Sequence, residues 1–375
     1  MDRVAIIGVG LVDTLGNNPE MCLVNYLMKI HEPDECFYSN YDLLQPENIR
    51  APVYASLVKS NKMALHTVEQ ALINITHSSN VAVVYSSVTN CTEVHADNAR
   101  RVDEDKRIKP REAVQLPDDF IAGLISREYD FYGVSTGLSA ACATSLYNID
   151  YAMRLVDEYD YVVVGATDAA TSKYDLAYYD QLGALGTHSA PFDNNRDGFV
   201  MGEGAGCLVL QREELARKND QTIYGYINNV GLSNDASYGN AIAPDLEGRG
   251  IKRAMNSALC GDVSGISFVS AHATSTQLGD IIEYNAIRDV IPNAKVVGLK
   301  SKLGHCMGAS GIVELIYTLG CLNNNIVPYN HNIQDCDLDI PVEIGKSEKM
   351  FALKNSMGFG GKNASILVER YYDGM

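Results

Sequence analysis

The chain has 375 residues, and its 46% of apolar and 21% of charged side chains are typical of a globular protein. A formal net charge of −17 argues against nucleic-acid binding, because contacts to phosphates need cationic side chains. No apolar run approaches the roughly 20 residues that span a bilayer, and the first residues lead into a strand pattern instead of a signal peptide. We therefore expect a cytoplasmic protein that is not inserted in a membrane.

Apolar runs typical of strands alternate with helical patterns along the chain. In the first half, strands are predicted at 4–9, 81–85, 161–165 and 206–210, and helices at 19–28 and directly after residue 142. In the second half, strands are predicted at 222–230, 266–270, 295–297, 342–344 and 364–368, and helices at 246–259, 280–290 and 308–322. This alternation indicates an α/β fold in which helices cover a mixed sheet.

The length of the chain favours two units over one, because single hydrophobic cores stop growing at roughly 250 to 300 residues. We place the boundary in the polar stretch 211–221, which gives units 1–215 and 216–375. Nine cysteines are scattered without any C-x-x-C pair, so we expect reduced thiols and no metal site.

Cys142 lies in the small-residue run 138–145, directly ahead of a helical pattern. A thiolate at the first turn of a helix is stabilised by free amides and by the helix dipole, so we expect its pKa to be lowered towards neutrality. This position suits a nucleophile. The alternative is a structural cysteine, since unmodified cysteine is among the most buried residue types.

Two histidines follow in segments rich in glycine and hydroxyl groups. His272 begins the run His-Ala-Thr-Ser-Thr-Gln-Leu-Gly-Asp, and His305 ends the run Lys-Ser-Lys-Leu-Gly-His that starts at Lys300. Further blocks lie at 3–10, 192–200, 202–206 and 355–363. In this order they resemble the beta-ketoacyl-acyl carrier protein synthases, the elongating condensing enzymes of fatty acid and type II polyketide assembly. The resemblance spans nearly the whole chain.

The resemblance implies a thiolase-like five-layered fold of two pseudo-duplicated halves, and a decarboxylative Claisen condensation. Cys142 would accept the acyl group, and its amide and that of Phe359 would hold the oxyanion. His272 and His305 would stabilise the enolate formed from a malonyl thioester. The enzyme would need no cofactor of its own, because the phosphopantetheine arm arrives on the acyl carrier protein.

Other residues take supporting roles by the same resemblance. Lys300 would form an ion pair with Glu314, and Thr274, Thr276 and Phe199 would contact the pantetheine arm. Asp280 and Glu283 are expected to be structural, capping a helix and binding loop amides.

The expected partners are an acyl carrier protein and a second ketosynthase-like subunit, identical or related, because the family builds its pocket floor at a twofold interface. An acidic carrier would need a local basic patch on this acidic chain. Lys59 and Lys62 lie three apart on one predicted helix face, and six more cations fall between residues 100 and 111. The alternative is a solvated helix face, since acids are interspersed there.

The chain departs from the family pattern at three positions: Ala273 replaces a usual Gly, Met357 a common Phe and Lys362 a usual Thr. The link 188–190 is also shorter than usual. These departures favour a specialised pathway, polyene or polyketide, as an alternative to fatty acid synthesis. A thiolase is disfavoured because no second cysteine lies near 358–362, and a starter enzyme acting on acyl-CoA is disfavoured by Lys300. The second hypothesis is that the protein is an inactive chain-length factor that pairs with a ketosynthase.

Overall fold

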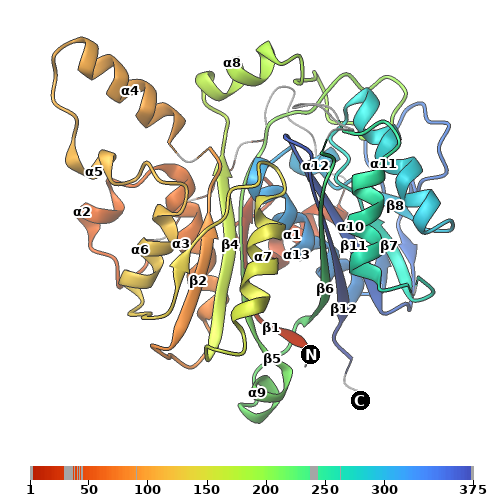
Figure 1. The fold of residues 1–375 in the computed structure, drawn as a ribbon, viewed down its shortest axis with the longest axis horizontal. Coiled ribbons are helices and arrows are strands. Elements are labelled where there is room, and N and C mark those ends of the chain that lie inside the picture. Colours follow the sequence, from red (N-terminus) through yellow and green to blue (C-terminus); the bar gives the residue numbers. More distant parts are fainter. Residues whose placement is uncertain are drawn as a thin grey trace.

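The computed structural model describes residues 3–28, 37, 39, 41, 43, 45–89, 91–236, 244–261 and 263–372 (Figure 1). Ten strands form one mixed sheet in the order β3-β2-β4-β5-β1-β6-β12-β11-β7-β8. The strands of its first half are β1 (Val4–Asp13), β2 (Val81–Ser86), β3 (Ser135–Thr136), β4 (Tyr161–Ala169) and β5 (Glu203–Arg212). Those of its second half are β6 (Gly225–Asn234), β7 (Ile266–Ser270), β8 (Val296–Val297), β11 (Phe351–Gly358) and β12 (Lys362–Arg370). A separate pair consists of β9 (Ile326–Val327) and β10 (Gly345–Lys346).

The two halves of the sheet repeat one topology. In each half, three neighbouring strands run parallel and the next two pairings are antiparallel. The halves meet where Val4, Ala5 and Ile6 of β1 pair with residues 225–227 of β6. The chain passes from the first half of the sheet to the second between Arg212 and Gly225, close to the boundary proposed from the sequence. That the halves are separate units stays a prediction.

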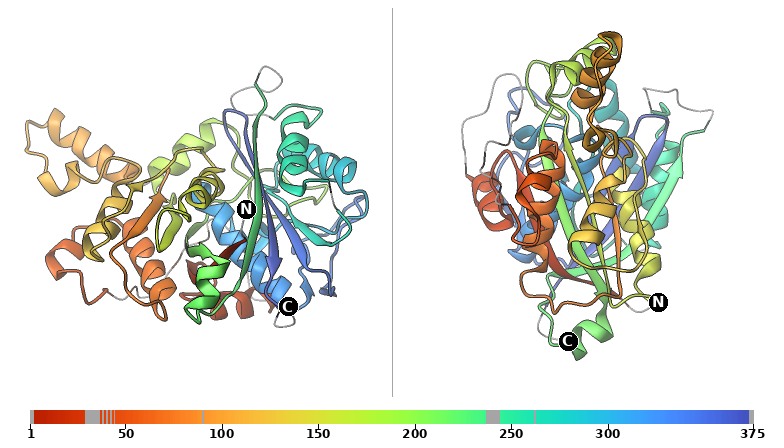
Figure 2. Two further views of the ribbon diagram at one scale, coloured as in Figure 1. Left: turned by 60° about the horizontal axis from the view of Figure 1, so that its bottom comes forward. Right: turned by 90° about the vertical axis from the view of Figure 1, so that its left-hand side faces the viewer.

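Helices form three layers around the halves of the sheet. Between the halves lie α7 (Thr144–Leu155) and α13 (Ser310–Asn323), each of which contacts strands of both. The outer face of the first half is covered by α3 (Lys59–Leu72) and α6 (Phe120–Glu128), and that of the second by α10 (Arg249–Leu259) with α11 (Gln277–Val290) packed on it. Figure 2 shows the first half, red to yellow-green, beside the second, green to blue. The predicted five-layered α/β fold is confirmed.

The remaining helices are short or lie at the edges of these layers. They are α1 (Pro19–Leu27), α2 (Ala51–Tyr54), α4 (Thr92–Asp103), α5 (Pro110–Ala113), α8 (Lys173–Gln181), α9 (Glu213–Lys218), α12 (Lys300–Leu303) and the 3-10 turn η1 (Met307–Ala309). Among the described residues, no helix combines the length and the apolar character that crossing a membrane requires.

The position of α13 explains its sequence. It is buried on nearly every side, as a helix between two sheets must be, and its apolar residues accordingly follow one another without a polar face. By contrast, α10 buries one stripe and exposes the other. Cys142 directly precedes α7 of this central layer, and Glu314 lies on α13.

One predicted strand is absent, and one strand was not predicted. Residues 342–344 are not a strand, because their alternating apolar side chains lie at the surface: Val342 is 53% and Ile344 49% exposed. The two-residue strand β10 follows them. In turn, β11 was not predicted, because Lys354, Asn355 and Ser356 interrupt its apolar pattern although all three are buried.

Candidate active site

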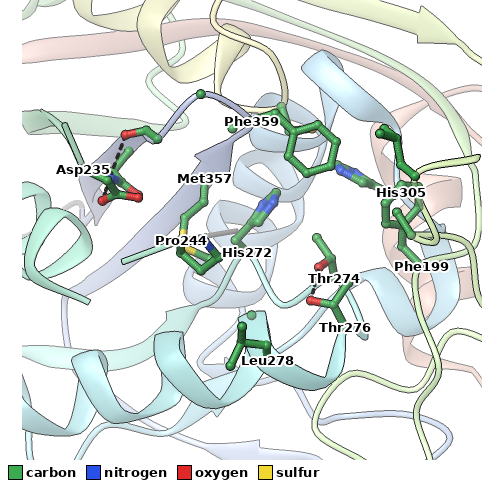
Figure 3. Close-up of a pocket in the computed structure, with 18 of the residues that line it drawn as sticks. Phe199, Asp235, Pro244, His272, Thr274, Thr276, Leu278, His305, Met357 and Phe359 are labelled. Carbon is green, nitrogen blue, oxygen red and sulfur yellow. Dashed lines mark hydrogen bonds between the residues drawn. The ribbon is translucent and has the colours of Figure 1, made fainter. Parts of the chain in front are cut away.

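Four loops bring the predicted site residues to one cavity of about 250 Å³ (Figure 3). Cys142 precedes α7, His272 follows β7, His305 follows α12, and Phe359 lies in the hairpin between β11 and β12. The cavity is lined by Cys142, Leu182, Gly183, Ala184, Phe199, Asp235, Pro244, His272, Thr274, Thr276, Leu278, Gly279, His305, Met357, Gly358, Phe359, Gly360, Gly361 and Asn363. The nucleophile, both imidazoles and the hairpin that were predicted separately thus share one space.

Cys142 occupies a strained turn immediately before the cap of α7. Ala141 has a positive φ of 49°, unusual for a residue with a side chain, and Ala143 is the N-cap. The thiol is 5% exposed, and burial raises its pKa to about 12, although the positive charge of Lys300 acts in the opposite direction. The prediction of a pKa lowered towards neutrality is therefore wrong for the resting site, because desolvation outweighs the stabilising charges.

The hairpin approaches the cysteine loop closely. A Cβ atom on Gly358 would lie 2.5 Å from the carbonyl oxygen of Ala140 and 3.2 Å from the amide nitrogen of Cys142, so only glycine fits. Gly360 and Gly361 complete the turn with φ of 82° and 74°. This packing places the Phe359 segment beside the nucleophile, as an oxyanion site built from the two amides requires. The role of those amides stays a prediction.

The two imidazoles face one another at the cavity. The rings of His272 and His305 are 5.4 Å apart and inclined at 80°. Burial, reinforced by the charge of Lys300, lowers the pKa of both far below the ordinary value, so both are neutral at pH 7. Figure 3 shows these rings and that of Phe359 converging on the cavity.

The partners of the two Nδ1 atoms are compatible with one tautomer. The Lys300 ammonium lies 3.5 Å from Nδ1 of His272, and the Ser310 hydroxyl lies 2.9 Å from Nδ1 of His305. An ammonium group can only donate, and a serine hydroxyl can donate, so both contacts fit imidazoles that carry their proton on Nε2. Each ring then offers one Nε2–H donor.

The predicted Lys300–Glu314 ion pair is present. Lys300 Nζ lies 2.6 Å from Oε1 of Glu314, and both side chains are 1% exposed. Sequence reasoning missed a third member, Lys354, whose Nζ lies 2.7 Å from Oε2 of the same carboxylate. Local sequence gives no signal for it, because Lys354 interrupts the apolar pattern of its strand and Glu314 lies 40 residues earlier.

The segment after His272 curls instead of running extended. Ala273 and Ser275 have φ of 35° and 67°, which explains why the family usually has glycine at the first of these positions. The hydroxyls of Thr274 and Thr276 lie 3.1 Å apart, because the curl brings them together, and both residues line the cavity. Contact with a pantetheine arm stays a prediction.

Two carboxylates hold this curl. Glu283 accepts the amides of His272 at 2.7 Å and of Ala273 at 2.8 Å. Asp280 accepts the amide of Ser275 at 3.1 Å and also that of Phe192 at 2.9 Å. Both were predicted to bind loop amides, and they do. The predicted helix cap is wrong for α11, whose N-cap is Thr276 and which has no side-chain cap hydrogen bond.

Phe199 and two of the positions that depart from the family pattern, Met357 and Lys362, differ in whether they line the cavity. The Phe199 ring packs edge-on against His305 at 5.1 Å and forms a wall of the cavity. Met357 also lines the cavity. Lys362, at the start of β12, pairs with Gly358 of β11 and with Asn234 of β6 and does not line the cavity.

The predicted docking lysines are less free than the sequence suggested. Lys59 forms an ion pair with Glu203, and Lys62 lies 5.4 Å from the ring centre of Tyr54. Within the run 100–111, four cations form ion pairs with nearby acids: Arg100, Arg101, Lys106 and Lys109. Local pairing weakens the case for a strongly attractive patch, and docking there stays a prediction.

Comparison with known families agrees with this geometry. The model described as "Beta-ketoacyl synthase, N-terminal domain" matches residues 45–216, and "Beta-ketoacyl synthase, C-terminal domain" matches residues 224–334. These matches cover well over half of the chain. The protein therefore belongs to the beta-ketoacyl synthase family, whose members are condensing acyltransferases.

Individual relatives agree. The chain is 29% identical, over 99% of its own length and 100% of the relative, to 3-oxoacyl-[acyl-carrier-protein] synthase 1 of Buchnera aphidicola subsp. Baizongia pistaciae (strain Bp). It is 34% identical, over 71% of its length and 69% of the relative, to 3-oxoacyl-[acyl-carrier-protein] synthase 2 of Staphylococcus aureus (strain COL). It shares its fold, with a TM-score of 0.86, with a solved type II PKS ketosynthase bound to its acyl-carrier protein and the hexaketide; that match covers 99% of this chain and 100% of the other at 23% identity.

Proposed function

We propose that the protein catalyses decarboxylative condensation of a malonyl carrier protein with an acyl group held on Cys142. The observation that carries this function is the meeting of one buried thiol and two neutral imidazoles, His272 and His305, in a single cavity. A thiol accepts acyl groups, and neutral N–H donors stabilise an enolate without donating a full proton. The two stages of a condensation need these two kinds of group.

In the first stage, the Cys142 sulfur attacks the thioester carbonyl of the acyl carrier. The thiol proton leaves with the carrier thiolate, and the acyl–sulfur bond passes from the carrier to Cys142. Because the pKa of the resting thiol is about 12, proton loss accompanies attack and does not precede it. The amides of Cys142 and Phe359 would hold the oxyanion, and such donors lower a barrier by about 3 to 4 kcal/mol each when water is excluded.

In the second stage, the malonyl thioester oxygen receives hydrogen bonds from Nε2 of His272 and of His305. The carbon–carbon bond to the carboxylate breaks and carbon dioxide leaves. The electron pair of the broken bond forms the enolate. The enolate carbon then attacks the acyl group on Cys142, and the carbon–sulfur bond breaks as the new ketone forms. The released Cys142 thiolate takes up a proton from water, which restores the resting thiol. Lys300 supports this stage because its charge adds to the effect of burial, which is the main cause that lowers the pKa of both imidazoles.

The partners follow from the reaction. The substrate would arrive on an acyl carrier protein, as the names of the curated relatives state for those enzymes. We also propose that the chain works as a dimer in the cytoplasm, with itself or with a related subunit, because the cavity floor lies at a twofold interface in the family it belongs to. Light scattering of the chain alone, and of the chain expressed with a related subunit, tests this.

The function is tested by incubating the purified chain first with carrier protein that bears an acyl group and then with malonyl carrier protein. A β-ketoacyl carrier product and carbon dioxide are expected, and Cys142→Ala should form neither the acyl adduct nor the β-ketoacyl product. A wild-type chain that binds a ketosynthase-like partner but forms no acyl adduct would instead identify an auxiliary chain-length factor.

A further inference from the structure

Glu314 holds two buried lysines, one on each carboxylate oxygen. Lys300 Nζ lies 2.6 Å from Oε1, and Lys354 Nζ lies 2.7 Å from Oε2. None of the three side chains is more than 1% exposed. One lysine already neutralises the carboxylate, and burying a further ammonium group is costly. The second lysine therefore needs another explanation.

Each ammonium group also binds a carbonyl at the end of β7. Lys354 Nζ donates to the carbonyl of Ala271 at 3.1 Å, and Lys300 Nζ donates to that of His272 at 2.5 Å. From the other side, Glu283 accepts the amides of His272 and of the next residue. Charged side chains thus hold the peptide groups on both sides of His272, directly before the curl with positive φ.

Charged groups reach this position from four elements. Lys354 on β11 faces Glu314 on α13, Lys300 on α12 and Glu283 on α11. It also faces both imidazoles of the cavity. After burial, which is the main cause, the positive charges of Lys300 and Lys354 both contribute to the lowered imidazole pKa values.

We propose that Lys354 is a positioning residue for decarboxylation: with Lys300 it ties the end of β7 to Glu314 and so holds the His272 imidazole aimed at the substrate oxygen. The inference rests on the proposed function, because it assigns Lys354 to the second stage of that reaction. Lys354 does not line the cavity and acts only through His272 and its neighbours.

The test is Lys354→Met, which keeps the unbranched shape of the side chain and removes its charge. With malonyl carrier protein as the probe, decarboxylation should fall by up to about 100-fold, as for a catalytic group displaced by about 1 Å. The acid limb of its pH profile should move to higher pH, because the imidazoles lose a neighbouring positive charge. Acyl transfer to Cys142 should keep the wild-type rate. Lys354→Arg should return the acid limb to its wild-type position.

Lys302→Met is the matched control. Lys302 is 3% exposed, and its ammonium group donates to the carbonyls of Tyr26, at 3.0 Å, and Met28 at the end of α1. Its removal takes the same charge from the same core, and Lys302 is not among the charges that lower the two imidazole pKa values. A merely structural loss would lower rates without moving the acid limb, so the profile separates the two roles.

A second measurement uses the wild type and so does not depend on a variant that folds. Burial lowers the pKa of Lys354 to about 8, so the imidazole NMR signals of His272 and His305 should shift as the pH passes that value. The proposal is overturned by a wild-type rate and profile in Lys354→Met, by an equal profile shift in Lys302→Met, or by imidazole signals that do not move. A wild type that fails to decarboxylate malonyl carrier protein would overturn the proposed function itself, and this inference with it.

Discussion

Replacement of His305 by Ala should separate the two stages of the reaction. His305 is 2% exposed, its Nδ1 is held by Ser310 at 2.9 Å, and its ring faces that of His272 across 5.4 Å. It is thus a fixed donor in a site from which water is largely excluded. Removing one such donor costs about 3 to 4 kcal/mol, so malonyl decarboxylation should fall about 10²- to 10³-fold.

The assay follows carbon dioxide release from malonyl carrier protein and, in a separate reaction, acyl adduct formation on Cys142 by intact mass. His305→Ala should lose the first and keep the second, because the enolate exists only in the second stage. Ser310→Ala is the control: it removes a single hydrogen bond to Nδ1, worth about 0.5 to 1.5 kcal/mol, so the loss should stay near tenfold or below. Decarboxylation at the wild-type rate in His305→Ala, or equal loss of both stages, would refute the assignment.

Three further outcomes follow from the site. Because burial raises the pKa of Cys142 to about 12, its thiolate fraction should rise with pH throughout the neutral and mildly alkaline range; iodoacetamide labelling, mapped to the Cys142 peptide, should increase without a plateau, and a plateau near pH 7 would contradict the buried thiol. Gly358→Ala should slow acyl transfer, because the new methyl would lie 2.5 Å from the Ala140 oxygen and push the hairpin from the cysteine loop; an unchanged acylation rate would show that the hairpin amide is not needed. Lys62→Glu should raise KM for carrier-bound substrate and leave KM for an acyl-CoA surrogate unchanged, because only the carrier protein would meet this surface. Equal effects on both substrates would indicate general damage. Lys59 is not substituted, because a carboxylate there would lie beside that of its partner Glu203.

The sequence was sufficient where chemistry and local spacing coincide. Cys142 before a helix, and His305 five residues after Lys300, could be read directly, and the structure brings them together in one cavity. Lys354 could not be read in this way, because its partner Glu314 lies 40 residues earlier and the contact exists only once β11 packs against α13. The pKa of Cys142 was misjudged for a related reason: the helix start is visible in the sequence, whereas the desolvation that outweighs it depends on the packing of distant segments.

A similar limit applies to the fold. Uniformly apolar strands such as β2 and β4 were predicted, since burial on both faces leaves a continuous apolar run. In contrast, β11 carries buried polar groups whose partners are remote in sequence: Lys354 binds Glu314, and Asn355 binds Glu283. Its strand character is therefore hidden from any pattern based on hydrophobicity.

The most direct test of the central claim is a sequential experiment on the wild-type chain, followed by intact mass. Addition of carrier protein that bears an acyl group should raise the mass of the chain by one acyl group, located on Cys142. Subsequent addition of malonyl carrier protein should remove that group. Each acyl group removed should yield one carbon dioxide molecule and one β-ketoacyl carrier product. A chain that never gains the acyl group, or that loses it without forming the β-ketoacyl product, would contradict the account.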